Sequence, residues 1–386
     1  MTICEKRNCT GCGACVSACP HNCISLQPFA EDGHIYPVVD EQICVSCGLC
    51  QKICPQNTGA ILCRPQNVYA GWSLSKEEHC LSASGGLASY FSRKILESGG
   101  VVYGCSSEIS QQKITHIRCE TEQDLKKLRG SKYAQSEIGD CFIRCQADLQ
   151  AGKDVLFVGT PCQIGGLRAF LKKTYDNLYT ADLVCHGVVP LAFLFEHLKT
   201  LNVVGDIVAF RTPNGMRLTV YQNGEETFSA SRRDDIYYIG FLQGLFFRDS
   251  CYACQYAKAE RVGDITLADF WGLGKEIPFQ HSMENGVSLL LVNTEQGRTL
   301  LDKFSDGLFL EERTLDEAKK ENGNLHSPSP KHKNTEKFKK LYKKYGFDKA
   351  AKKSLRKERW KYKIVQFSDN SKLVRKIIRL LRGGDR

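Results

Sequence analysis

The sequence contains no apolar run long enough to cross a bilayer. Its longest apolar stretches, such as "VSLLLV" at 287–292, fall far short of the roughly 20 residues that a spanning helix needs. The first residues, "MTICEKRNCTGC", lack the apolar core of a secretory signal. We therefore expect a cytoplasmic protein, whose only membrane contact would be peripheral, at the inner face.

Net positive charge is absent from most of the chain. The total is +10, but residues 331–386 contain 21 Lys and Arg against 5 Asp and Glu, a net charge of +16 that leaves −6 for the rest. No known nucleic-acid-binding motif accompanies these cations, so nucleic acid is not the expected partner. The composition predicts a basic helical tail over 331–386.

This tail interleaves cations with aromatic residues and ends in the amphipathic segment "SKLVRKIIRLLR". Such a helix suits an anionic membrane surface. A dock for an acidic partner protein and a merely solvated helix are the alternatives. We expect truncation after Ser327 to spare the flavin and the clusters but to alter partitioning.

Disulfides are not the expected use of the 20 cysteines, because disulfide scaffolds belong to small secreted chains. Eight cysteines form two runs of the pattern C-x2-C-x2-C-x3-C-P, which is typical of iron–sulfur proteins. In such runs the first three thiolates hold one cube and the fourth reaches the partner cube. The spacing thus predicts two 4Fe-4S clusters, one held by Cys9, Cys12, Cys15 and Cys54, the other by Cys44, Cys47, Cys50 and Cys19.

Zinc is the alternative for these eight thiolates, since they would supply two tetrahedral sites. The duplicated spacing with trailing prolines favours iron–sulfur. Residues 1–63 resemble bacterial two-cluster ferredoxins, with a longer insert between the runs; Cys4 and Cys23 fall outside the pattern and are interpreted as bystanders. A ferredoxin-like domain only moves electrons, so the rest of the chain should contain a redox centre.

Four further cysteines follow predicted strands or form a pair. Cys162 lies in "GTPCQ", Cys185 in "DLVCHG", and Cys251 and Cys254 in "CYAC". These four are candidates for a third 4Fe-4S cluster. The alternative is two buried thiols and a chance pair, because free cysteine behaves as a small hydrophobe. Spacing alone does not decide between them.

The rest of the chain predicts a mixed α+β and α/β architecture. Residues 64–200 alternate short apolar strands with amphipathic helices, as in "GKDVLFVGTPCQIGGLRAFLKK". Residues 205–320 indicate an antiparallel subregion, because "TVYQNGEETFSA" alternates around Asn223-Gly224, a hairpin signal.

Several blocks, in order, resemble the coenzyme F-420 hydrogenase/dehydrogenase beta-subunit family. They are "SASGGLASYFSRKILESGGVVYG", "LRGSKYAQSEIG", "FVGTPCQIGGLR", "DLVCHG" and "CYACQYAKAERVGDITLADFWG". The resemblance covers residues 66–320, with an N-terminal part of 66–150 and a C-terminal part of 151–320. It implies an FAD-binding oxidoreductase domain, and it favours the third cluster.

Within those blocks, several residues suit a flavin. In "SASGG" the backbone of Ser84, Gly85 and Gly86 and the following helix end suit a pyrophosphate, although an ordinary helix cap explains the same pattern. "RGSKYAQS" offers cations and a ring, with a surface loop as the alternative. Thr160 and Pro161 follow a strand, where ligands gather in α/β sheets, and Asp269 suits a ribose or the orientation of a loop. The remaining candidates are Arg129, Gly130, Ser131, Lys132 and Tyr133.

His186 is the candidate for proton transfer, because it follows Cys185 and its unperturbed pKa is near neutral. A histidine that steadies the loop by hydrogen bonds is the alternative.

The leading hypothesis is an enzyme that exchanges single electrons with ferredoxin or another one-electron carrier. Through FAD it would exchange a hydride with a deazaflavin or another two-electron substrate. A second hypothesis is an electron-relay subunit of a larger redox or surface-polysaccharide-associated complex. A third makes Cys162 a thiol nucleophile, although no His partner is visible.

Overall fold

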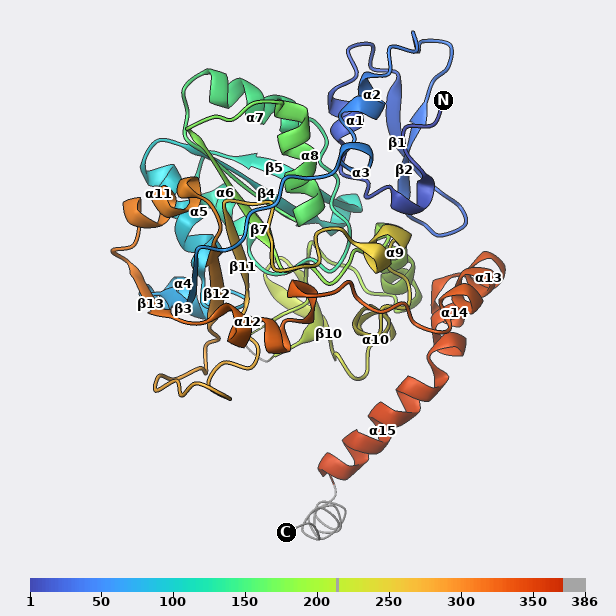
Figure 1. Cartoon of the computed structure of the whole chain (residues 1–386). Helices are drawn as coiled ribbons and strands as arrows, with labels where there is room; N and C mark the ends of the chain where they lie inside the picture. Colours follow the sequence, from blue (N-terminus) through green and yellow to red (C-terminus); the bar gives the residue numbers. More distant parts are fainter. Residues whose placement is uncertain (213–214, 371–386) are drawn as a thin grey trace.

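A computed structural model describes residues 1–212 and 215–370 of the chain, the last five by their backbone alone. The N-terminal region contains one antiparallel strand pair and three short helices (Figure 1). Two of these helices begin at glycines in the left-handed conformation, Gly13 (φ +80°) and Gly48 (φ +73°), where a side chain would be strained. The elements are η1 (Lys6–Asn8), α1 (Ala14–Ser17), β1 (Ile24–Pro28), β2 (Ile35–Val39), α2 (Leu49–Lys52) and α3 (Pro55–Thr58).

The body is organised on a mixed sheet of eight strands in the order β13-β3-β12-β11-β7-β6-β4-β5. The neighbours β4, β6, β7 and β11 run parallel, and the remaining pairings are antiparallel. The strands are β3 (Asn67–Ser73), β4 (Val101–Glu108), β5 (Lys113–Cys119), β6 (Val155–Gly159), β7 (Leu178–Leu183), β11 (Ile265–Asp269), β12 (Ser288–Val292) and β13 (Leu308–Glu312).

Helices cover both faces of this sheet because its central strands are apolar on both sides. Tyr103 and Phe157 pack against α7 (Cys141–Gln150) and α8 (Pro161–Leu171), whereas Leu156 packs on the opposite face with α5 (Leu87–Glu97) and α11 (Glu295–Lys303). The N-terminal region lies against α8, on the first of these faces (Figure 1). The other elements of this part are α4 (Lys76–Leu81), η2 (Ile109–Gln111), α6 (Glu122–Leu128), α12 (Leu315–Glu321) and η4 (Gly323–Leu325).

The expected antiparallel subregion is present, as a three-stranded sheet in the order β10-β9-β8. Its hairpin turns at Asn223 and Gly224, which both have positive φ, as the Asn-Gly signal predicts. Together with the eight-stranded sheet and the N-terminal region, it confirms the mixed α/β fold class. Its elements are α9 (Leu191–Thr200), β8 (Ile207–Ala209), β9 (Arg217–Gln222), β10 (Glu225–Ser231), α10 (Ile236–Leu242) and η3 (Asp249–Ala253).

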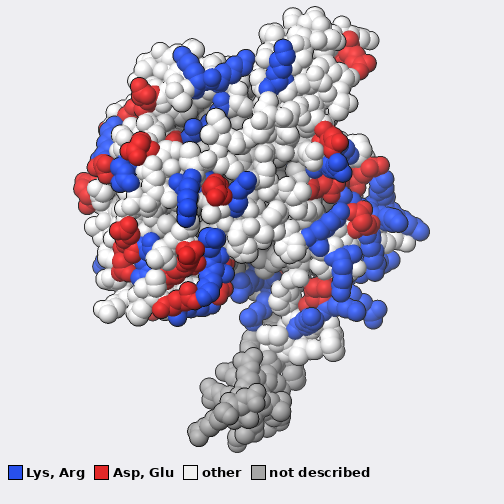
Figure 2. Space-filling model, viewed as in Figure 1, with Lys and Arg blue, Asp and Glu red and all other residues white. Residues whose placement is uncertain are grey.

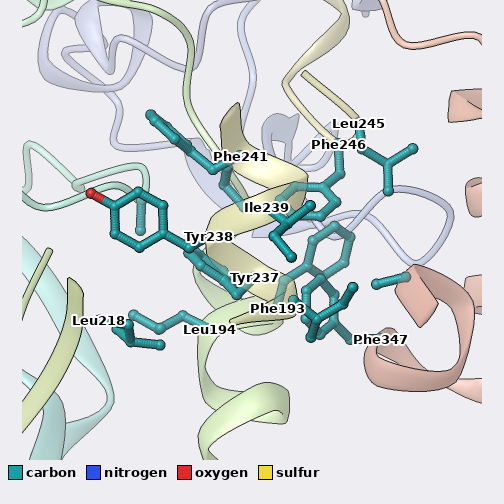
Figure 3. Close-up of a cluster of buried hydrophobic side chains, with 14 of the residues drawn as sticks. Phe193, Leu194, Leu218, Tyr237, Tyr238, Ile239, Phe241, Leu245, Phe246 and Phe347 are labelled. Atoms are coloured by element: carbon teal, nitrogen blue, oxygen red, sulfur yellow. The ribbon is translucent and has the colours of Figure 1, made fainter. Parts of the chain in front are cut away.

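The start of the basic tail is part of the body. Phe338 of α13 (Thr335–Tyr345) and Phe347 of α14 (Phe347–Ser354) are each 1% exposed and belong to one buried cluster. Figure 3 shows Phe347 beside Phe193 and Tyr237 of this cluster. Truncation after Ser327 would therefore remove part of the body's core, which the composition of the tail did not indicate. Only α15 (Arg356–Asn370) projects from the body in Figure 1; "SKLVRKIIRLLR" lies outside the described residues.

No helix among the described residues is long and apolar enough to pass through a membrane.

A buried histidine fastens α14 to the body. His197 of α9 is 2.7 Å from Asp235 and 3.1 Å from Asp348, and all three side chains are almost fully buried. Burial alone would disfavour the imidazolium, but the two carboxylates outweigh it and raise the pKa of His197 to about 9. The tail is thus held by a charged histidine between two aspartates.

We expect His197→Gln to lower the free energy of unfolding by about 3 kcal/mol at pH 6, since it leaves two carboxylates unpaired in the interior. A folded-state pKa raised above the ordinary value of about 6.5 gives stability that is complete below that pH and is lost as the pH rises through 9. The difference between wild type and variant, measured by anaerobic denaturant unfolding, should therefore shrink by pH 9.5. His281→Gln, at an exposed histidine, is the control; an equal effect of His197→Gln at both pH values would contradict a charged His197.

Candidate metal centres and the adjoining sheet edge

The N-terminal region brings its eight patterned cysteines into two groups, each combining both runs. Cys19 lines one surface pocket with Cys44, Cys47 and Cys50. Cys15 has Cys12, Cys9 and Cys54 as its electrostatic neighbours. The thiols therefore lie in space in the crossed arrangement that the spacing predicts. The group around Cys47 is the more exposed one, since Cys47 lies at the surface whereas Cys9, Cys12 and Cys54 are buried.

The thiols of Cys4 and Cys23 are not remote from these groups. Cys4 is in hydrogen-bonding contact with Cys9 and Cys54, and the Cys23 sulfur lies 3.4 Å from that of Cys19. Sequence reasoning set both aside because they fall outside the ligand pattern. Each group of four therefore has a fifth thiol beside it, which only the fold reveals.

The four remaining candidate ligands line a single pocket. Cys162 at the start of α8, Cys185 after β7, and Cys251 and Cys254 in and after η3 face it together. They meet because β6 and β7 are parallel neighbours, so the segments that follow the two strands leave the same edge of the sheet. Four sulfur donors suit an iron–sulfur cluster or zinc. Among the residues that the structure describes, no three His, Cys, Asp or Glu side chains gather around a single-ion site.

A buried ion pair holds two of these cysteine segments together. Arg261, 1% exposed, lies 2.9 Å from Asp182 at the end of β7 and also donates to the carbonyl oxygens of Tyr256 and Leu183. Asp182 in turn accepts from the backbone N–H groups of Val262 and Gly263. The pair thereby fixes the segment after Cys254 onto the strand that leads to Cys185. Nothing in the motif spacing indicated these two residues.

The third pocket adjoins the inner group of the N-terminal region. A Cβ atom added to Gly166 of α8 would lie 3.0 Å from the Cys12 sulfur, so a side chain there would crowd this approach. The ring of Tyr256 is buried beside it, with Cys162, Cys12, Cys254 and Cys54 as its electrostatic neighbours. The three groups of cysteines therefore follow one another in space: the exposed one, the inner one and the pocket of the body.

Two of the flavin candidates lie farther along the same edge of the sheet. Asp269 ends β11, its register partner on β12 is Ser288, and the partner of Ser288 on β3 is Gly71. Gly85 packs on these strands so closely that a Cβ would lie 2.3 Å from the Gly71 carbonyl oxygen. The same Cβ would lie 2.8 Å from the Ser288 nitrogen, so the "SASGG" turn of Ser84–Gly86 packs on β12, the neighbour of the strand that Asp269 ends. Gly86, with φ +83°, begins α5.

Other candidates already have protein partners. The Lys132 ammonium donates to the carbonyl oxygens of Lys127, Leu128 and Arg129 at the end of α6. The Tyr133 ring stacks on Phe241 with 4.3 Å between centroids. Thr160 caps α8, where Pro161 is the first residue. Gly130, with φ +79°, lies in the loop between α6 and α7. Arg129 and Ser131 lie in the same loop, where the Arg129 carbonyl oxygen accepts from Lys132.

Arg211 is a neighbour of Asp269 that sequence reasoning missed. The two side chains form an ion pair, and the Arg211 guanidinium lies 5.7 Å from the ring centroid of Trp271, which is 38% exposed. His186 is exposed and lines the pocket of Cys185. A cation, an exposed indole and a histidine thus follow the third group of cysteines along the edge. "FRTPNG" offered no signal for Arg211.

The structure offers little support for Cys162 as a nucleophile. The thiol of Cys162 has the Thr160 hydroxyl as its side-chain hydrogen-bonding partner, 3.2 Å away, and not a histidine. Burial raises the pKa of the Cys162 thiol to about 12, the opposite of what an activated cysteine needs.

Replacing Cys185 with serine should remove about four iron atoms per chain from anaerobically purified protein, because one cube of four irons would lose a ligand. Colorimetric iron and sulfide counts measure this directly. Cys80→Ser, at an exposed cysteine, should leave both counts unchanged. Full iron in Cys185→Ser would contradict ligation by this pocket.

Comparison with known proteins agrees with both regions. Residues 8–58 match the family model described as 4Fe-4S dicluster domain, and residues 152–318 match the family model for the carboxyl-terminal part of the Coenzyme F420 hydrogenase/dehydrogenase beta subunit. No curated protein matches the chain. A solved chain of the F420-reducing [NiFe] hydrogenase complex from Methanosarcina barkeri is similar at 18% identity and a TM-score of 0.46, over 76% of this chain and 92% of that one.

Proposed function

Since this chain joins a 4Fe-4S dicluster domain to a domain of the coenzyme F420 hydrogenase/dehydrogenase beta-subunit type, we propose that it is an iron–sulfur flavoprotein oxidoreductase. The observation that carries the proposal is the pocket of Cys162, Cys185, Cys251 and Cys254. It lies between the inner thiols of the dicluster domain and the sheet edge of Asp269. Three 4Fe-4S clusters held there would form a conducting series through the molecule.

Electrons enter or leave at the dicluster domain. Cys47 is exposed and lines the outer pocket with Cys44 and Cys19, so a cluster bound there would be the one nearest to solvent. Ferredoxin or another one-electron carrier is the proposed partner. The buried Cys9, Cys12 and Cys54 would hold the next cluster away from water.

The proposed flavin lies along the carboxyl edge of the sheet. Bound FAD would supply the exchange between single electrons and a hydride. Gly85, Gly86 and the N-terminal end of α5 suit its pyrophosphate, since free backbone N–H groups and the helix dipole favour anions. Asp269 orients Arg211, and Trp271 offers an exposed ring face for stacking. His186 would hold a proton at its imidazole beside the third cluster.

The proposed two-electron substrate is a deazaflavin or another oxidised compound. The enzyme hypothesis requires that the purified chain turn over substrate by itself when it is supplied with reduced ferredoxin. Reduction of the clusters without any turnover would favour the relay-subunit hypothesis instead.

We expect Arg211→Gln to weaken FAD binding by roughly tenfold to a hundredfold, the range for a lost hydrogen bond to a charged group. Fluorescence titration of flavin-depleted protein measures the dissociation constant. Arg217→Gln, in the adjacent β9 where the side chain bonds Ser229, is the matched control. Equal FAD affinity of Arg211→Gln and wild type would place the flavin elsewhere.

We also propose that α15 meets an anionic membrane surface. Glu358 bonds His332 and Tyr362 bonds Gln243, so one side of the helix contacts the body. Trp360 and Ile364 are 68% and 47% exposed. Trp360 lies two residues after Glu358, and Ile364 lies two residues after Tyr362, which turns both about 200° around the helix, to the side opposite the body. Arg356, Lys357 and Lys363 adjoin that side in sequence, and Figure 2 shows Lys and Arg gathered over this part of the molecule. An indole and an aliphatic side chain among cations suit a lipid headgroup region.

The double variant Trp360→Ala and Ile364→Ala should reduce co-sedimentation with vesicles of anionic phospholipid about tenfold, since it removes two side chains that would be buried in the lipid. Val204→Ala, at another exposed apolar residue of the body, should have no effect. Undiminished sedimentation, or none by wild type, would leave an acidic protein as the partner.

A further inference from the structure

Arg248 is a fully buried arginine at the junction between the dicluster domain and the body. Its side chain is 0% exposed. It lies just before η3, whose Cys251 donates its backbone N–H to the Arg248 carbonyl oxygen. Its guanidinium lies 4.6 Å from the ring centroid of Tyr36 in the dicluster domain. One residue thus belongs by sequence to the third cluster segment and by contact to the other domain.

The hydrogen bonds of Arg248 all go to neutral acceptors. Its Nη1 donates to the carbonyl oxygen of Cys9 at 3.3 Å, and its Nη2 donates to that of Ile35 at 2.6 Å. Its Nε and Nη2 donate to the Gln135 Oε1 at 3.2 and 2.7 Å. Gly11 makes room for this arrangement, because a Cβ there would lie 2.8 Å from Nη2.

No carboxylate among the described residues neutralises this guanidinium. The adjacent Asp249 is bound 2.8 Å from Lys339, and Asp32 accepts from Tyr36 and lies 4.0 Å from Lys6. Burying an uncompensated charge costs more free energy than hydrogen bonds to neutral groups return. A fold that keeps such a charge needs negative charge close by from another source.

The thiols nearest in the electrostatic sense are predicted cluster ligands from two different groups. The positive charge of Arg248 acts on Cys9 of the inner group and on Cys162 and Cys251 of the third. Hydrogen bonds also join Arg248 to the backbone of Cys9 on one side and of Cys251 on the other. Arg248 therefore adjoins both cluster positions at once.

We propose that Arg248 is the positioning residue that compensates the negative charge of the inner and third clusters and raises their reduction potentials together. The inference rests on the proposed function, because it needs both clusters. Each cluster gains one negative charge when it accepts an electron from the reductant, so a fixed cation in a dry junction stabilises the reduced form. The outer group of Cys44, Cys47, Cys50 and Cys19 instead has the α-ammonium of Met1 as a neighbour of Cys44, and this cation is exposed and already paired with Glu41.

The test is a redox titration with dithionite, followed by electron paramagnetic resonance, on wild type, Arg248→Gln and Gln135→Glu. Arg248→Gln removes the charge, and Gln135→Glu places a carboxylate where Oε1 already accepts two bonds from Arg248. In both variants we expect the equilibrium constant for reduction of the inner and third clusters to fall at least tenfold, which is about 59 mV for one electron. The outer cluster should keep its potential.

Lys303→Gln is the matched control, because it removes one positive charge at the opposite edge of the sheet, where Lys303 pairs with Asp154 before β6. It should shift no potential. Unshifted inner and third clusters in an iron-complete Arg248→Gln or Gln135→Glu protein would overturn the proposal. Loss of iron by both variants would also overturn it, in favour of a purely structural arginine. Wild-type protein lacking the third cluster would instead refute the proposed function, and the inner cluster would still report on Arg248.

Discussion

The pairing of Arg261 with Asp182 is the interaction on which the third cysteine pocket depends. Both side chains are buried, and the aspartate also accepts the backbone N–H groups of Val262 and Gly263. A loop of small and polar residues has few apolar contacts of its own, so a charged anchor with all its hydrogen bonds made can define its path where packing does not. The four sulfurs converge because this anchor and the parallel pair β6–β7 act on the same edge.

Close backbone approach then joins the two domains. Gly166 of α8 admits Cys12, and Gly11 admits Arg248. At both places the missing side chain brings a predicted ligand segment of the dicluster domain against the body. The cysteine groups come close together through absent side chains as much as through specific contacts. Tyr256 and Arg248 fill the space between the groups.

Much of the plan was predictable because it depends on local pattern. The hairpin at Asn223-Gly224 and the strand before Cys162 follow from spacing within a few residues, and the crossed cysteine groups follow from the duplicated ligand motif. The partners of Arg211, Arg248 and Arg261 did not, because a buried charge is recognisable only once its distant partner is known, and Arg248 reaches Cys9 across 239 residues. The aromatic residues of the tail were misjudged for the same reason. Phe338 and Phe347 look like rings scattered among lysines until α9 and α10 are placed beneath them.

The packing of α13 and α14 has a consequence for biosynthesis. The cluster around Phe193 and Tyr237 is complete only when residues up to Leu355 have been added, whereas every predicted ligand of the two ferredoxin-type clusters lies at or before Cys54. On the ribosome the N-terminal region is therefore synthesised well before the last part of the body's core. Final closure of the body thus waits for α13 and α14, after most of the chain has been synthesised.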